Sequence, residues 1–174
     1  MGVAPLEKRA SESLRNTRKG HVMALRLVFA SDHAAVAMKA ALVVHARSLG
    51  HEVTDLGPDS EASVDYPDYG YMLAEAVAEG RADRGIALCG SGIGISIAVN
   101  RNPDLRCALV TEPLSARLAR EHNDANAIAM GARLIGIEQA KACLEAFLTT
   151  DFGGERHQRR VDKLSHPRTA KEPA

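Results

Sequence analysis

The chain has 174 residues, which is enough for one α/β domain with its own hydrophobic core. Lys and Arg number 22, as do Asp and Glu, so the formal net charge is zero, which disfavours nucleic-acid binding through overall charge. Three Phe, three Tyr and no Trp also leave few aromatic rings on which nucleic-acid bases could stack. Three cysteines without a Cys-x-x-Cys pair argue against a disulfide framework or a zinc site and fit a cytoplasmic protein. No apolar run reaches the roughly 18 residues that a membrane span needs.

The two ends of the chain differ in composition from its middle. Residues 1–22 are polar and basic and lack the apolar stretch of a secretory signal. We therefore expect a disordered extension over 1–22, one domain over 23–164 that begins at Met23, and a flexible tail over 165–174.

Short apolar runs alternate with helical patterns along the domain. Strands are expected at 25–30, 53–56, 85–88, 106–110 and 126–130, and helices at 36–49, 68–79, 95–99, 113–124 and 137–148, before a basic segment at 155–164. This alternation predicts an α/β fold, a three-layer Rossmann-like open sheet of about five parallel strands with helices on both faces. Ligands of such sheets bind beyond the carboxyl ends of the strands.

The segment after the third strand carries the strongest functional pattern. Cys89 ends the strand, and Gly90-Ser91-Gly92-Ile93-Gly94 leads into a helix. Main-chain N–H groups of such a turn favour negative charge, so a candidate base lies beside a candidate oxyanion hole. Position 95 is Ile, which excludes the dinucleotide fingerprint, and no Gly-Lys-Ser/Thr exists for a P-loop. Spacing alone leaves open a plain turn with a buried cysteine.

Other polar residues are also candidates for a site. They are Asp32 and His33 after the first strand, His122 beside Asn123 and Asp124, Arg133 after the fifth strand, and Arg156, Arg159 and Arg160 in the basic segment. The alternative for each histidine is a His–Asp capping pair, and for the arginines a solvated basic face. We expect Cys107 and Cys143 in the core, and His45 and His51 at the surface or at helix ends.

Taken together, the motifs resemble those of the ribose-5-phosphate isomerase B family, in a group that includes galactose-6-phosphate isomerase subunits. The resemblance covers about 25–164. Its motifs are Ser31-Asp32-His33, Asp65-Tyr66-Pro67-Asp68-Tyr69, Cys89-Gly90-Ser91-Gly92-Ile93-Gly94-Ile95-Ser96-Ile97-Ala98-Val99-Asn100, Glu112-Pro113, His122-Asn123-Asp124-Ala125-Asn126, Gly131-Ala132-Arg133 and Arg156-His157-Gln158-Arg159-Arg160-Val161.

The resemblance implies isomerisation of ribose 5-phosphate and ribulose 5-phosphate through a cis-enediolate, without metal or cofactor. It implies that Cys89 is the base, that Ser91 relays protons between the two oxygens, and that His122 opens the furanose ring. Substrate would be bound by Asp32, Tyr66 and Asn123 at the hydroxyls, by Gly90, Gly92, Ile93 and Gly94 in the loop, and by His33, Arg133, Arg156 and Arg160 at the phosphate.

In this family the two C-terminal arginines come from a neighbouring subunit, which implies a homodimer with shared sites and leaves a tetramer open. The alternatives are an isomerase of the same family for allose 6-phosphate, galactose 6-phosphate or a tetrose phosphate, and a non-catalytic sugar-phosphate-binding module. For an isomerase, we expect Cys89 and His122 to face one open cavity.

Overall fold

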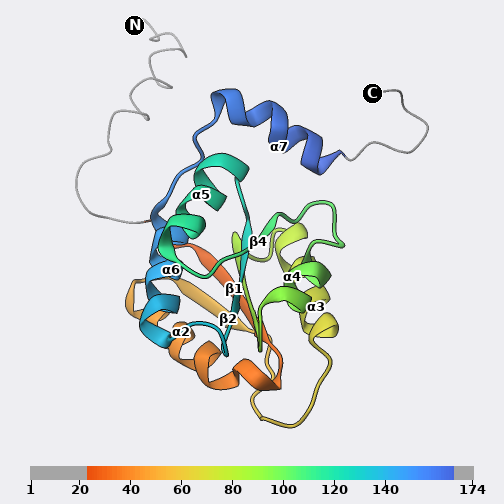
Figure 1. Cartoon of the computed structure of the whole chain (residues 1–174), viewed down its shortest axis with the longest axis vertical. Coiled ribbons are helices and arrows are strands. Elements are labelled where there is room, and N and C mark those ends of the chain that lie inside the picture. Colours follow the sequence, from red (N-terminus) through yellow and green to blue (C-terminus); the bar gives the residue numbers. More distant parts are fainter. Residues whose placement is uncertain (1–22, 167–174) are drawn as a thin grey trace, which may run out of the picture.

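The computed structural model describes residues 23–166, in which five parallel strands form one sheet (Figure 1). The strands are β1 (Arg26–Ser31), β2 (Glu52–Asp55), β3 (Arg84–Cys89), β4 (Cys107–Leu109) and β5 (Ala127–Gly131). Their order across the sheet is β2-β1-β3-β5-β4, so the chain reverses its direction of growth after β2. Such a reversal leaves a crevice at the carboxyl edge of the sheet, where ligands bind.

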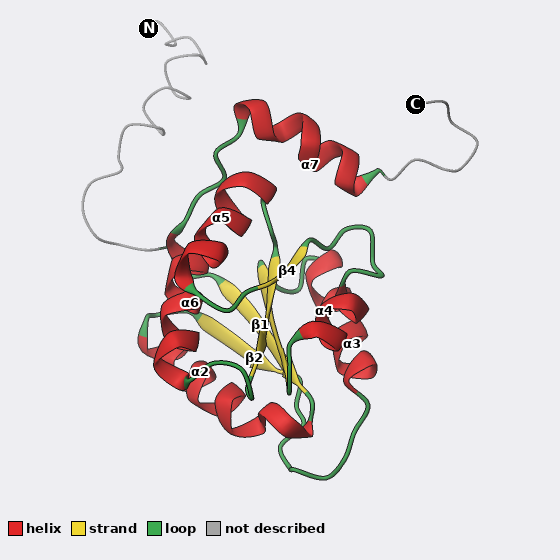
Figure 2. Cartoon of the chain, viewed as in Figure 1, coloured by secondary structure: helices red, strands yellow, loops and turns green. Residues whose placement is uncertain are grey.

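Helices cover both faces of the sheet (Figure 2). One layer contains α2 (Val36–Ser48), α5 (Pro113–Asn123) and α6 (Ile137–Thr149), and the other contains α3 (Tyr66–Ala78) and α4 (Ile93–Val99). Two 3₁₀ turns, η1 (His33–Ala35) and η2 (Glu155–His157), precede α2 and α7 (Gln158–Ser165), and α7 projects away from both layers in Figure 1. These layers confirm the predicted α/β fold.

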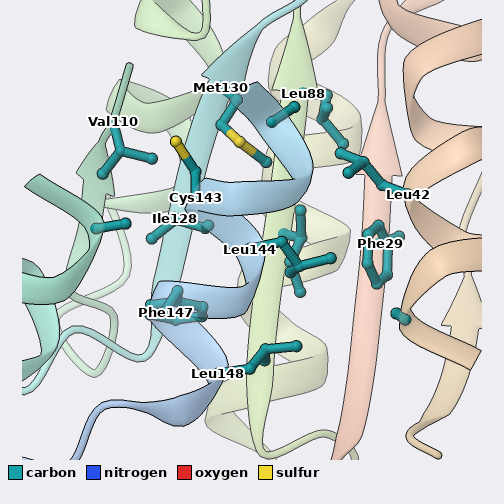
Figure 3. Close-up of a cluster of buried hydrophobic side chains, with 14 of the residues drawn as sticks. Phe29, Leu42, Leu88, Val110, Ile128, Met130, Cys143, Leu144, Phe147 and Leu148 are labelled. Carbon is teal, nitrogen blue, oxygen red and sulfur yellow. The ribbon is translucent and has the colours of Figure 1, made fainter. Parts of the chain in front are cut away.

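The central strands are buried on both faces because a helix layer packs on each. Successive residues of β1 point to opposite sides: Phe29 packs toward α2, α5 and α6, whereas Ala30 packs toward α3 and α4. The larger core lies on the first side and includes Phe29, Met130 and Phe147 (Figure 3). A rigid sheet therefore supports the loops at its carboxyl edge.

Some element boundaries differ from the predicted ones. Helix α3 begins at Tyr66 instead of 68, because Pro67 lies in its first turn, where a missing N–H costs no helical hydrogen bond. Helix α4 begins at Ile93 instead of 95, directly after Gly92, whose φ of 76° is left-handed. The segment 1–22 and residues 167–174 of the expected tail lie outside the described residues, while Ser165 completes α7.

Of the two positions expected for His51, a surface or a helix end, the helix end is confirmed, since its N–H donates 3.3 Å to the Ala46 carbonyl of α2, and the surface is not. His51 is only 6% exposed, and its Nδ1 accepts a hydrogen bond of 3.2 Å from the Leu25 N–H at the start of β1. Burial, and then the nearby charge of Arg84, lower the pKa of His51. Both expected core cysteines, Cys107 and Cys143, are buried as predicted. Among residues 23–166, no helix has the length and apolar character needed to cross a bilayer.

Candidate active site

A cavity of about 310 Å³ lies at the carboxyl edge of the sheet, where the crevice is expected. Its walls come from the ends of β1, β3 and β5 and from the start of α3. The lining residues are Asp32, Tyr66, Cys89, Gly90, Ser91, Gly94, Arg133 and Leu134. Seven of these are residues that the sequence motifs singled out, and Leu134 is the addition.

Cys89 is held by the turn that follows it. Its register partner is Gly131 at the end of β5, and its side chain lies on the α3–α4 side of the sheet. The Gly92 N–H donates a hydrogen bond of 3.0 Å to the Cys89 sulfur, and the Ile93 N–H donates one of 3.3 Å to the Ser91 hydroxyl. The turn therefore brings a thiol, a hydroxyl and main-chain donors within a few residues of each other.

Two glycines allow neighbouring segments to approach closely around this turn. A Cβ on Gly94 would lie 2.6 Å from the Tyr66 ring, and a Cβ on Gly131 would lie 2.6 Å from the Ser91 carbonyl. Both distances are shorter than van der Waals contact, so a larger residue at either position would displace the cavity wall.

Asp32 and His33 are oriented by backbone contacts at the end of β1. The buried Asp32 carboxylate accepts the Ala34 N–H at 3.0 Å and so caps η1. The His33 Nδ1 accepts the Val64 N–H at 3.2 Å, from the loop between β2 and α3. Since Nδ1 is the acceptor, His33 carries its proton on Nε2, which is available to donate to a ligand.

The three cysteines of the chain have different surroundings. Burial raises the pKa of Cys107 to about 12, and burial with the charge of Glu112 raises the pKa of Cys143 to about 11, so both thiols stay protonated near neutral pH. Cys89 is the one of the three that lines the carboxyl-edge cavity. All three cysteines are buried and Cys107 lines a different cavity, so it is the location at the carboxyl edge, where ligands of such sheets bind, that makes Cys89 the candidate reactive thiol.

A second group of the expected site residues lies at the opposite edge of the sheet. Helix α5 runs back from the carboxyl edge, so His122 and Asn123 in its last turn lie beside the start of β4, where Arg106 Nε donates 3.1 Å to the Asn123 carbonyl. The five residues of β5 separate the two edges by about 15 Å. Within one chain, the expected shared cavity for Cys89 and His122 is therefore not formed.

The basic segment joins this second group. His122 stacks on His157 with ring centroids 4.4 Å apart and ring planes 9° apart. Arg156 Nε donates 3.2 Å to His157 Nε2, and Arg160 Nη1 donates 3.4 Å to the Arg156 carbonyl. His122, Arg156 and Arg160 thus form one cluster around His157, which was not among the expected site residues, and this amino-edge cluster has Asn123 next to it in α5.

Comparisons with known proteins identify the family to which this fold and these motifs belong. The sequence pattern of the ribose/galactose isomerase family matches residues 27–164. Ribose-5-phosphate isomerase B of Escherichia coli is 42% identical over 140 residues, which cover 80% of this chain and 94% of that protein.

Solved structures show the same likeness in three dimensions. A ribose 5-phosphate isomerase of Thermotoga maritima is 45% identical with a TM-score of 0.80, covering 81% of this chain and 97% of that one. Ribose-5-phosphate isomerase B of Clostridium thermocellum is 43% identical with a TM-score of 0.80, covering 80% and 95%. The chain therefore belongs to the ribose/galactose isomerase family of sugar-phosphate isomerases.

Proposed function

We propose that the chain interconverts ribose 5-phosphate and ribulose 5-phosphate through a cis-enediolate, in a site completed by a second copy of the chain. The observation that carries the proposal is the cavity in which Cys89, with its sulfur accepting the Gly92 N–H, lies beside Ser91 and the glycine turn. Relatives named ribose-5-phosphate isomerase B support the choice of substrate.

The cavity contains the groups that proton transfer between C1 and C2 requires. In its thiolate form, Cys89 removes the C2 proton of the open-chain aldose and returns it to C1, while Ser91 moves the hydroxyl proton between O2 and O1. The Gly94 N–H stabilises the enediolate oxygens as charge develops, and the N–H groups of Gly92 and Ile93 join it when they turn from the Cys89 sulfur and the Ser91 hydroxyl to the substrate. A positioned base contributes about 10²–10⁴ in rate, and each key oxyanion donor about 10²–10³.

The far end of the substrate is held by cationic and donor side chains. Arg133 lines the cavity, and the free Nε2 of His33 lies at the same edge of the sheet. Binding of the phosphate positions C1 and C2 beside the base, so binding energy from a group remote from the reacting carbons lowers the activation barrier of proton transfer. Arg156 and Arg160 of a second copy would complete this grip.

An exposed apolar surface supports the presence of that second copy. Ile93 and Ile97 on α4 are 51% and 52% exposed, and Leu109 on the edge strand β4 is 41% exposed. These side chains flank the glycine turn, so a two-fold dimer packed here would cover them and bring the partner's amino-edge cluster toward Cys89. In that dimer, each site contains Cys89 from one chain and His122 from the other.

A substrate panel tests the activity. Purified protein is assayed with ribose 5-phosphate, allose 6-phosphate, galactose 6-phosphate and erythrose 4-phosphate, and the highest kcat/KM is expected with ribose 5-phosphate. Cys89→Ala should lower kcat at least about 100-fold while sugar-phosphate binding persists. A sugar-phosphate-binding module would bind without turnover, and a higher kcat/KM on a hexose or tetrose phosphate would replace the proposed substrate.

Mixing two inactive variants tests the shared site. Cys89→Ala and His122→Ala are each expected to be inactive, but one of the two sites in a mixed dimer has both residues intact. Random exchange of subunits should therefore restore about a quarter of the unaltered activity. If His122 served the cavity of its own chain, no mixture would regain activity.

A further inference from the structure

The His122–His157 stack is a feature that the proposed roles of the site residues do not use. The two rings are nearly parallel, and they come from α5 and from the η2 turn, which lie more than thirty positions apart in the sequence. Gly153 holds the intervening segment against α5 through its N–H, which donates 2.9 Å to the Glu121 carbonyl. The stack is therefore a tertiary contact that fixes the plane of the His122 ring.

His157 is itself oriented from its other side. Its Nε2 accepts the Arg156 Nε–H, so its own proton lies on Nδ1. Partial burial, followed by the charges of His122, Arg156 and Arg160, lowers the pKa of His157, with Glu121 opposing that effect. His157 thus lies between an arginine and the His122 ring.

We propose that His157 is a positioning residue whose stacked ring holds the His122 imidazole for opening of the sugar ring. This inference rests on the proposed function, in which His122 moves the proton that opens the furanose. A ring nitrogen that must meet the furanose oxygen depends on such support, because a displacement of about 1 Å can cost 100-fold in rate.

Assays that start from each of the two sugars distinguish ring opening from proton transfer at carbon. Ribose 5-phosphate is a furanose and must be opened before C2 can lose its proton. Ribulose 5-phosphate has its C5 oxygen phosphorylated, so it cannot close a furanose ring and reaches Cys89 in the open form. Exchange of its C1 hydrogen with deuterium from solvent therefore reports proton transfer without ring opening.

The test compares His157→Leu and His157→Gln, which lose the stacked ring, with His157→Phe, which keeps a flat ring. Leu and Gln are expected to lower kcat/KM for ribose 5-phosphate about 10- to 100-fold and C1 exchange of ribulose 5-phosphate less than about threefold, and Phe to recover most of the loss. His45→Leu is the matched control, because His45 pairs with Glu145 Oε1 at 2.7 Å on the α2–α6 surface. The His122 Cε1–H proton resonance should also lose its ring-current shift in Leu and Gln but not in Phe.

The outcomes of the test distinguish a failure of this inference from a failure of the proposed function. If the unaltered chain neither converts ribose 5-phosphate nor exchanges ribulose 5-phosphate, the proposed function is refuted, and the resonance still reports whether the rings stack. If the unaltered chain is active and the Leu and Gln variants lose both reactions equally, or lose neither, His157 does not position His122. Equal activities of the Phe and Leu variants would also overturn the inference, and circular dichroism of each variant shows that these comparisons concern folded protein.

Discussion

Gly131→Ala tests whether the end of β5 sets the position of the glycine turn that follows Cys89. The added methyl would lie 2.6 Å from both the carbonyl carbon and the oxygen of Ser91, and 2.9 Å from its Cα. These are backbone atoms, which cannot rotate away as a side chain does, so the strand and the turn must separate by most of an ångström.

This separation is expected to reduce the free energy of unfolding and kcat to different extents. Overpacking of a buried site costs about 1–3 kcal/mol of unfolding free energy. Ser91 and the N–H groups that follow it move with the turn, away from Cys89 and the substrate carbons, and a misplacement near 1 Å lowers kcat about 100-fold. We therefore expect a folded protein that has lost a moderate part of its stability and nearly all of its turnover.

Gly136→Ala is the control for this substitution. Gly136 has φ of −79°, and no atom lies within 4 Å of a Cβ added there. In urea titrations the free energy of unfolding of the control should lie within about 0.5 kcal/mol of that of the unaltered chain. Alanine lowers the conformational entropy of the unfolded chain, which stabilises the fold, but it caps the helix less well than glycine, and the two effects oppose each other. A Gly131→Ala protein with full kcat for ribose 5-phosphate would refute the reasoning that this contact sets the geometry of the turn.

Three further predictions concern the phosphate, the pH dependence and the support of α6. Arg156→Ala should raise KM for ribose 5-phosphate about tenfold, whereas Arg159→Ala beside it should leave KM unchanged, and equal effects in steady-state assays would remove Arg156 from the phosphate site. Because the pKa of His51 is lower folded than unfolded, stability should be highest above its unfolded value of about 6.5 and fall as the pH decreases below it; His51→Asn should weaken this dependence in urea titrations from pH 7.5 to 5.5, and an unchanged slope would contradict it. Arg84→Leu leaves the carbonyls of Phe147 and Leu148 without their donor, so unfolding should cost about 1–3 kcal/mol less, and an unchanged urea midpoint would show that these bonds contribute nothing.

Local sequence was sufficient for the architecture and for one half of the site. Apolar runs alternating with helical periods predicted five parallel strands, because the pattern of burial along each element is a property of neighbouring residues. The position of Cys89 at the end of β3, ahead of a glycine turn, followed from the same pattern, as did the placement of Asp32 and Arg133 at the same edge. Parallel strands bring these loops together whatever the details of packing.

Contacts between distant segments decided the rest. His51 follows the end of α2 as its sequence position indicates, but its burial under the start of β1 was not expected, and the role of His157 depends on the contact of its ring with His122. The direction of α5 separates His122 from Cys89 within one chain, although the motifs suggest one cavity. Which faces meet depends on the three-dimensional path of the chain, and local periodicity holds no information about partners that lie twenty-five or more residues away.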